Sequence, residues 1–286
     1  YSVASAAYRR AAMAAPPGKR SSSLYHAAMM TKQTGKYMEW EDLVREAQAA
    51  VTDTGSGYAV WIEKEYKVIP EVRRLLADTA SQMVWNAGER INTIYAETSP
   101  WFSGDTMLYY ASGSPPGSPL LGEAYDDQHF RILEASFDLA KTKPGVEMGR
   151  RINDAATHNA NAVLSADGRR LFFSRCEKTA TRNCGIWYAD RVRGKWGKAR
   201  PVRGEVNMTG YSSTHPALDT LDGRTILYFS SDRPGGYGGW DLYYTILDGY
   251  RPGPVVNLGK PVNTEGNERT PTIHEGSLFF SSDGHP

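Results

Sequence analysis

Apolar residues in the first part of the chain recur every three or four positions, which is the spacing of one face of an α-helix. The pattern runs through residues 24–50 and is interrupted once, around Gly35. It predicts two helices, with Ser21, Ser22 or Ser23 as N-cap and with Gly35 ending the first helix in a left-handed conformation. The apolar positions are Leu24, Ala27, Ala28 and Thr31, then Trp40, Leu43, Val44 and Ala47.

Two flanking stretches extend this helical region. Residues 7–12 predict a preceding helix, which Pro16 and Pro17 end. Residues 58–85 predict two further helices around Pro70, and we expect them to connect the helices to the next domain and to pack on it. Their apolar positions are Trp61, Ile62, Val68, Val72, Leu75, Leu76, Met83 and Val84.

From residue 91 onward the pattern changes to short apolar runs between Gly-rich turns, which indicates β-strands. The runs form a repeated unit with three recognisable parts. An aliphatic residue and an asparagine begin it, at Ile91-Asn92, Ile152-Asn153, Val206-Asn207 and Val262-Asn263. An anchor dipeptide follows, at Ser99-Pro100, Ala160-Asn161, His215-Pro216 and Thr270-Pro271. The third part is a strand that starts with leucine and two aromatic residues, at Leu108, Leu171, Leu227 and Leu278.

A period in the fifties with about four short strands is typical of a β-propeller blade, whose two apolar faces are buried by stacking on the neighbouring blades. We therefore predict that residues 91–286 form about four blades or part-blades of an incomplete ring. The alternative is a β-sandwich with accidental self-similarity. A six-bladed ring needs about 330 residues at this period, so we expect the natural chain to continue or the missing blades to come from elsewhere.

Composition and charge exclude some classes of partner and location. The chain has 286 residues and a net charge of +1, which argues against nucleic acid as a partner. It contains no stretch of about 18 apolar residues, so we expect no membrane span. It begins at Tyr1 without a signal segment, so we expect a mature form or a piece of a longer chain.

The two cysteines, Cys176 and Cys184, are expected at facing ends of one hairpin. A disulfide is the favoured interpretation and would imply an oxidising compartment. Two reduced thiols are the alternative. A zinc site is disfavoured, because no second Cys or His pair lies nearby with ligand spacing.

The sequence offers little chemistry of its own. It has neither a Gly-x-Ser-x-Gly motif nor a His-Glu-x-x-His motif. His158 and His215 lie close to anchors and could meet at one face of the ring, although a hydrogen bond within each blade is the simpler interpretation. Asp167, Asp222, Asp232 and Asp283 recur in turns and are expected to cap them rather than to bind calcium. We therefore expect no catalytic residue, no metal, no cofactor and no enzymatic activity.

Two surface regions are candidate contacts for a partner. Arg191, Arg193 and Lys195 form a basic run that is either a solvated loop or a docking patch for an acidic partner. Tyr237 and Trp240 could contact a peptide or a glycan, although such aromatic residues more often pack between blades.

Residues 230–243, Ser-Ser-Asp-Arg-Pro-Gly-Gly-Tyr-Gly-Gly-Trp-Asp-Leu-Tyr, carry a specific resemblance. Together with Asp222-Gly223-Arg224 and Val262-Asn263-Thr264, they resemble the WD40-like repeat of TolB-type propellers. Residues 1–56, with Gly35 and Tyr37 at the turn, resemble a tetratricopeptide repeat less closely, and residues 57–90 then form a helical connector.

This order of domains resembles that of periplasmic proteins of Bacteroidota, in which an OmpA-like peptidoglycan-binding domain follows the propeller. The resemblance implies a periplasmic, outer-membrane-associated scaffold of a cell-envelope machine, of the type IX secretion class. Its partners would be other secretion proteins and, through the absent OmpA-like domain, peptidoglycan. The alternative is a propeller that itself binds glycan or peptidoglycan fragments.

Overall fold

The computed structural model describes residues 1–77, 86–93, 95–104, 106–113, 130–138, 141–177 and 183–285. The chain divides into two compact units, one helical and one built of β-strands, with the division at Val84 and Trp85. We describe each unit by itself.

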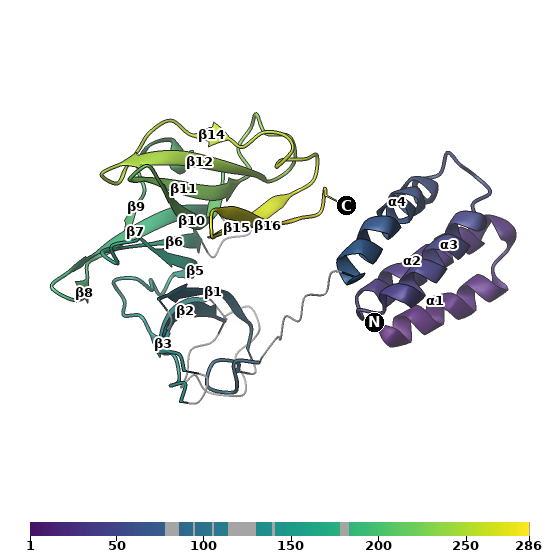
Figure 1. Ribbon diagram of the computed structural model, residues 1–286, viewed down its shortest axis with the longest axis horizontal. Coiled ribbons are helices and arrows are strands. Elements are labelled where there is room, and N and C mark those ends of the chain that lie inside the picture. Colours follow the sequence, from purple (N-terminus) through teal and green to yellow (C-terminus); the bar gives the residue numbers. More distant parts are fainter. Residues whose placement is uncertain are drawn as a thin grey trace. The chain divides into compact units, whose positions relative to one another are not determined.

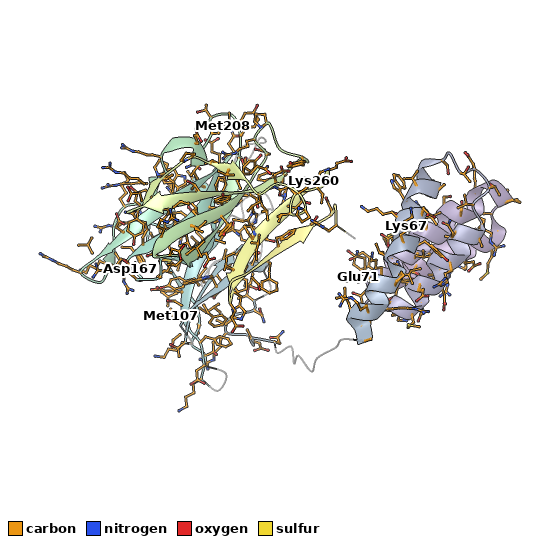
Figure 2. The ribbon with its side chains drawn as sticks, turned by 45° about the horizontal axis from the view of Figure 1, so that its top comes forward. Lys67, Glu71, Met107, Asp167, Met208 and Lys260 are labelled. Carbon is orange, nitrogen blue, oxygen red and sulfur yellow. A yellow bond between two sulfur atoms is a disulfide. The ribbon has the colours of Figure 1, made fainter. Side chains whose placement is uncertain are left out.

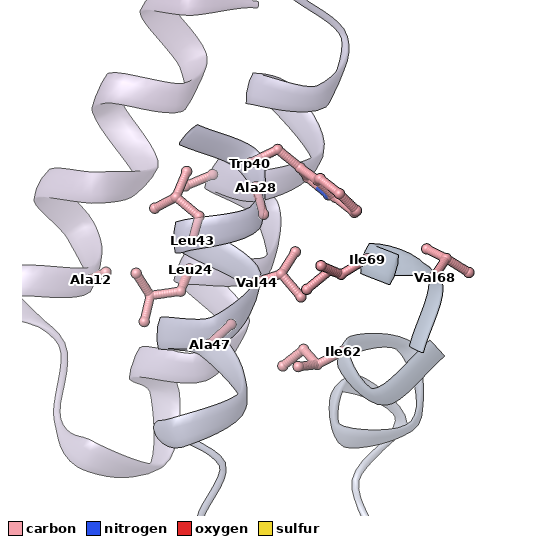
Figure 3. Close-up of a cluster of buried hydrophobic side chains, with 11 residues drawn as sticks. Ala12, Leu24, Ala28, Trp40, Leu43, Val44, Ala47, Ile62, Val68 and Ile69 are labelled. Carbon is pink, nitrogen blue, oxygen red and sulfur yellow. The ribbon is translucent and has the colours of Figure 1, made fainter. Parts of the chain in front are cut away.

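The helical unit contains four antiparallel helices within the described residues, and each packs on the next along the chain. They are α1 (Ser2–Ala14), α2 (Pro17–Lys32), α3 (Tyr37–Ala49) and α4 (Gly57–Ala77). Their core is the predicted stripe: Ala27, Ala28 and Ala47 are fully buried, and Trp40 and Leu43 pack around them (Figure 3). The small alanines let α2 and α3 approach closely. The helices predicted in residues 24–50 and 7–12 are confirmed.

Three details differ from the predictions for these helices. The serines at 21–23 are not N-caps, because α2 already begins at Pro17, whose fixed φ suits the first helical position. Pro70 lies inside α4 and does not divide it. Ile62 and Ile69 of α4 are buried in the core shared with α2 and α3, so this part of the expected connector packs on the helical unit. Met83 and Val84 lie outside the described residues.

Gly35 has the expected left-handed conformation, with φ +73°. The structure shows helices here but does not show that they are tetratricopeptide repeats. No helix among the described residues is long and apolar enough to cross a membrane.

The β unit is propeller-like, and its sheets follow one another in chain order around the unit (Figure 1). We call them blades 1 to 4. In the part of the chain that the structure describes, blade 1 is β1 (Glu97–Ser103), β2 (Met107–Ser112), β3 (Arg131–Ser136) and β4 (Val146–Glu147). Blade 2 is β5 (Thr157–Leu164), β6 (Arg170–Glu177), β7 (Cys184–Val192), β8 (Lys195–Trp196) and β9 (Arg200–Pro201). Blade 3 is β10 (Ser213–Leu221), β11 (Arg224–Ser231), β12 (Asp241–Asp248), β13 (Arg251–Pro252) and β14 (Val256–Asn257). Blade 4 is β15 (Glu268–His274) and β16 (Ser277–Ser282). The first strands of successive blades contact each other: β1 with β5, β5 with β10, and β10 with β15.

The repeated leucines occupy equivalent positions, as predicted. Leu108 pairs with Phe102, Leu227 with Leu218, and Leu278 with Ile273, each two places after its anchor dipeptide. Leu171 pairs with Leu164, three places after Ala160-Asn161, so the pairing in blade 2 is displaced by one residue from the sequence repeat. The first three leucines are buried, and Leu278 is half-buried. This shared register supports blades over a sandwich.

The two aromatic residues that follow Leu171 are buried on opposite faces of blade 2, because side chains alternate along a strand. Phe173 packs with Tyr109 and Ile132 of blade 1. Phe172 packs with Leu227 and Phe229 of blade 3. The core of the β unit therefore lies between the blades, as the repeat predicted.

The asparagine that begins the second, third and fourth repeats joins its own blade to the preceding one. Asn153 Oδ1 accepts a hydrogen bond from Ile132 N (2.9 Å), and its Nδ2 donates to Ile132 O (2.9 Å) and Met148 O (2.7 Å). Asn207 makes the same three contacts with Ile186 N (2.7 Å), Ile186 O (2.8 Å) and Val202 O (2.8 Å). Asn263 bonds to both backbone groups of Leu242 in the same way (2.8 and 2.9 Å). We call this contact the asparagine clamp.

The predicted disulfide is confirmed. Cys176 on β6 faces Cys184 on β7 in the strand register, and their sulfur atoms are bonded at 2.00 Å.

Replacing Asn207 by alanine should lower the free energy of unfolding of the β unit by about 3 kcal/mol, because three hydrogen bonds are lost and the buried Ile186 N loses its acceptor, while Ile186 O keeps the bond from Val202 N (2.9 Å). Urea titration followed by tryptophan fluorescence measures the change. Asn92→Ala is the matched control, since Asn92 heads blade 1 and its amide nitrogen bonds only to the exposed Asn86 Oδ1 (2.9 Å) among the described residues. Equal losses in the two variants would contradict the clamp.

Candidate ligand-binding cavity

A β-bulge interrupts the first strand of each described blade at its anchor. The residue at the bulge has positive φ each time: 55° at Ser99, 57° at Asn161, 54° at His215 and 52° at Thr270. In blade 2 the anchor is therefore Asn161-Ala162, one residue later than the sequence repeat indicated. Asparagine tolerates this conformation better than alanine, which explains the shift. Bulges and strained residues of this kind are concentrated at functional sites.

These bulges line a cavity of about 390 Å³ between the inner strands β1, β5, β10 and β15. Its described lining consists of Thr98, Ser99, Pro100, Trp101, Asn161, Ala162, Val163, His215, Pro216, Ala217, Leu218, Thr270, Pro271, Thr272 and Ile273. No charged side chain is among them, so the cavity combines neutral hydrogen-bonding groups with apolar surface.

The polar groups of the bulges are held by neighbouring blades. Asn161 Nδ2 donates to Ser99 Oγ at 2.6 Å, which joins blade 2 to blade 1. The backbone N of His215 donates to Ser174 Oγ at 2.8 Å, which joins blade 3 to blade 2. Thr270 Oγ1 and Ser281 Oγ are 2.7 Å apart within blade 4. The side chains at the bulges are thus oriented before any ligand arrives.

His215 is the exception, because its Nδ1 atom is buried and has no hydrogen-bond partner among the residues that the structure describes. Burial, and secondarily the positive charge of Arg269, lowers the pKa of His215 from 6.5 to about 4. The imidazole is therefore neutral at neutral pH. A neutral imidazole can accept a hydrogen bond from a hydroxyl group or donate one to it.

The other predicted site residues lie outside the cavity. His158 is on β5 next to Phe130, whose backbone N donates to His158 Nδ1 at 3.3 Å. The position equivalent to His215 in blade 2 is Asn161, and His158 is not part of the cavity lining, so the structure does not bring the two histidines into one site. The structural interpretation of His158 is the better one.

The basic run lies on the hairpin of β7 and β8. Arg191 Nε donates to Gly194 O at 3.4 Å, and its guanidinium lies 5.4 Å from the centre of the Trp196 ring. Arg193 forms the turn, and Lys195 begins β8. All three charged residues are exposed and remote from the cavity lining, so docking of an acidic partner stays a prediction.

Tyr237 and Trp240 belong to the Gly-rich loop between β11 and β12, which docks on blade 4. Trp240 O accepts a hydrogen bond from Glu268 N at 2.7 Å. A Cβ on Gly238 would lie 1.8 Å from Gly266 O, so only glycine fits there. Close approach, and not a positive φ angle, requires glycine at this position, since within residues 235–239 only Gly235 has positive φ. Tyr237 is exposed near Lys260, whose Nζ is 5.6 Å from the ring centre.

Three of the four predicted aspartates accept hydrogen bonds from backbone N–H groups, whereas Asp222 lies in its turn with φ 51° and its carboxylate has no hydrogen bond among the described residues. Asp167 Oδ1 accepts from Ser165 Oγ (2.6 Å) and from Arg169 N (3.0 Å), and these bonds lower the pKa of its carboxyl group (Asp167 is labelled in Figure 2). Asp232 accepts from Ser212 N and Asp283 from Asn267 N, both at 2.6 Å. No group of three potential metal ligands occurs among the described residues.

The sequence interpretation missed Ser99, Trp101, Asn161 and Thr270 as cavity residues. The signal was present, because three of the anchors are a polar residue followed by proline. Equivalent positions on inner strands face a common space, and that inference would have placed these residues together.

Because native His215 resists protonation and the unfolded chain does not, unfolding binds a proton below pH 6.5. The free energy of unfolding should therefore fall as the pH falls from 6.5 to about 4, with about 3 kcal/mol from this residue. The variant His215→Asn should keep the bulge, because Asn161 occupies the equivalent position in blade 2, and should lose the pH dependence that the imidazole contributes. Urea titrations at several pH values, with the exposed His274→Asn as control, measure it. An unchanged slope in His215→Asn would contradict the burial of the neutral imidazole.

No protein-family model matches the sequence, and no curated protein matches it. Among solved structures, TolB from Acinetobacter baumannii aligns over 67% of this chain and 39% of that one, with 15% identity and a TM-score of 0.39. A thermostable family-43 glycoside hydrolase aligns over 64% and 63%, with 14% identity and a TM-score of 0.42. The α-L-arabinofuranosidase from Lactobacillus brevis aligns over 66% of each chain, with 13% identity and a TM-score of 0.41. The chain thus spans less than two thirds of the length of each of these proteins.

These likenesses concern the propeller fold, and they lend no support to the finer resemblance to secretion proteins with an OmpA-like domain. They do correct one expectation. We expected no enzymatic activity, and this expectation is contradicted because several matched structures are glycoside hydrolases by name. With identities below 25% and TM-scores below 0.5, no activity or ligand is transferred from them.

Proposed function

We propose that the β unit binds a glycan fragment in the cavity between its inner strands. The observation that carries this proposal is the cavity of about 390 Å³, in which a polar side chain from the bulge of each described blade stands beside apolar surface. A volume of this size lies at the lower end of the range for small-ligand sites. It accommodates one or two sugar rings.

The chemistry of the lining matches that of a sugar. Sugar rings have apolar faces and hydroxyl groups at their edges. Trp101 and the prolines that follow the bulges offer apolar surface, while Asn161 and Thr270 offer donors and acceptors. The buried Nδ1 of His215 has no hydrogen-bond partner in the described part of the chain, and a ligand hydroxyl would supply one.

The disulfide supports a location outside the reducing cytoplasm, and we propose the periplasm, as the sequence resemblance implies. Peptidoglycan fragments are glycans of that compartment and are the first ligands to test. The scaffold role in type IX secretion, with a domain order similar to that of PorE and an outer-membrane association, is the second candidate. It rests on the sequence resemblance, and the docking of partners on the helical unit belongs to it.

The test titrates the full chain with three probes: a muropeptide, a tetrasaccharide of N-acetylglucosamine, and arabinotetraose. Calorimetry should show saturable binding of at least one probe. His215→Asn should weaken that binding at least tenfold, because the imidazole is lost while the bulge is kept. His274→Asn is the matched control and should bind like the wild type, since its side chain is exposed and outside the lining.

A reducing-end assay on the same mixtures separates binding from hydrolysis. Release of new reducing ends would make the site catalytic. Absence of saturable binding with all three probes would contradict the proposed glycan site. Recovery of secretion proteins with the chain from solubilised envelopes would then favour the scaffold role.

A further inference from the structure

Arg269 immediately precedes the lining residue Thr270 on β15 and is not itself part of the lining. Its guanidinium stacks on the indole of Trp240, with Cζ 4.3 Å from the ring centre. Trp240 comes from blade 3, and its backbone is tied to blade 4 by the bond from Glu268 N and by a bridge to Asn267. The indole is therefore a fixed platform for the arginine.

The guanidinium of Arg269 has no hydrogen bond and no ion pair within the described part of the chain, and the residue is exposed. Other stacked arginines of the β unit are already occupied. Arg170 stacks on Tyr188 and donates to Asp190 Oδ1 at 2.7 Å. Arg175 and Arg233 donate to backbone carbonyl groups of Ile152 and Val206, at 2.6 and 2.8 Å. Arg269 thus stacks like a structural arginine but keeps all its donors available.

Arg269 adjoins the lining residue Thr270, and its positive charge is a secondary cause of the lowered pKa of the lining residue His215. No carboxylate is among the lining residues to neutralise it. A ligand held against Thr270 and His215 would therefore meet one positive charge beside the cavity lining. Stacking uses the face of the guanidinium and leaves its N–H edge for a planar acceptor, and a carboxylate is the acceptor that fits this edge with two parallel hydrogen bonds.

We propose that Arg269, held on Trp240, binds the carboxylate of an acidic sugar whose ring occupies the cavity. This inference rests on the proposed function and specifies its ligand class: glycans that carry a carboxylate, in place of neutral ones. The carboxylate has two sources in bacterial glycans, the lactyl group of a muramic acid and the ring carboxyl group of a uronic acid.

The test uses ligand pairs that differ in charge alone. Tetragalacturonic acid is compared with its methyl ester, and the disaccharide of N-acetylglucosamine and N-acetylmuramic acid with its own methyl ester. The wild-type chain should bind the acid of at least one pair about fivefold to tenfold more tightly than the ester. Raising the NaCl concentration from 50 to 500 mM should weaken binding of that acid and leave the ester unaffected. The pair that shows the preference identifies the source.

Arg269→Gln should remove both the preference and its salt dependence, while binding of the ester stays at the wild-type level. Arg269→Lys should retain part of the preference, because the charge remains without the planar edge. Arg224→Gln is the control, since Arg224 is an exposed arginine of the same unit outside the cavity lining.

The outcomes separate the two proposals. If the wild-type chain binds acid and ester equally, or if Arg269→Gln keeps the preference, the acidic-sugar inference is wrong and the glycan site stands. If it binds neither member of either pair and none of the three earlier probes, the glycan site is wrong and the inference falls with it.

Discussion

The architecture of the β unit depends on asparagine side chains whose amide groups form hydrogen bonds with backbone N–H and C=O groups of the preceding blade. Asn153 and Asn207 each close three hydrogen bonds with backbone atoms of the preceding repeat, and Asn263 bonds to both backbone groups of Leu242. Asn153 and Asn263 are almost completely buried, so an unpaired strand end at these places would be costly. No other side chain of this size offers both a donor and an acceptor with the geometry of a peptide group. The asparagine clamp connects successive blades. The bulged inner strands belong to these blades, so their relative positions depend on the clamp.

Hydrophobic packing between blades buries the apolar faces that a single blade would leave exposed. Phe172 and Phe173 are adjacent in sequence but belong to two separate cores, one shared with blade 3 and one with blade 1. The Gly-rich loop adds a backbone contact, since Gly238 approaches Gly266 without room for a side chain. Blades are therefore stable as a series, which is the behaviour of repeat proteins.

The sequence predicted the parts of the fold that depend on local periodicity and recurrence. The helical stripe around Trp40, the shared register of the leucines and the pairing of the cysteines are all confirmed. It did not predict that α4 continues through Pro70, because burial of Ile62 and Ile69 on neighbouring helices outweighs a local helix breaker. It found the recurring asparagines and missed their function, since their partners are backbone atoms that carry no sequence signal. The cavity was missed for a similar reason: Ser99 and Thr270 are ordinary polar residues until the inner strands bring them to one space.

The expectation about catalysis failed differently, because the absence of a familiar motif says little about a fold in which several hydrolases are known.

At the bulges of the inner strands, the backbone conformation is the same in every described blade, whereas the side chain that lines the cavity differs. The backbone at these positions is held in one left-handed conformation by the hydrogen bonds around it, whichever of serine, asparagine, histidine or threonine occupies the place. The bulge conformation is therefore compatible with several different polar side chains. Substitutions at the bulges could therefore change the hydrogen-bonding groups of the cavity, from hydroxyl to amide or imidazole, one blade at a time and without a change in the fold of the blades.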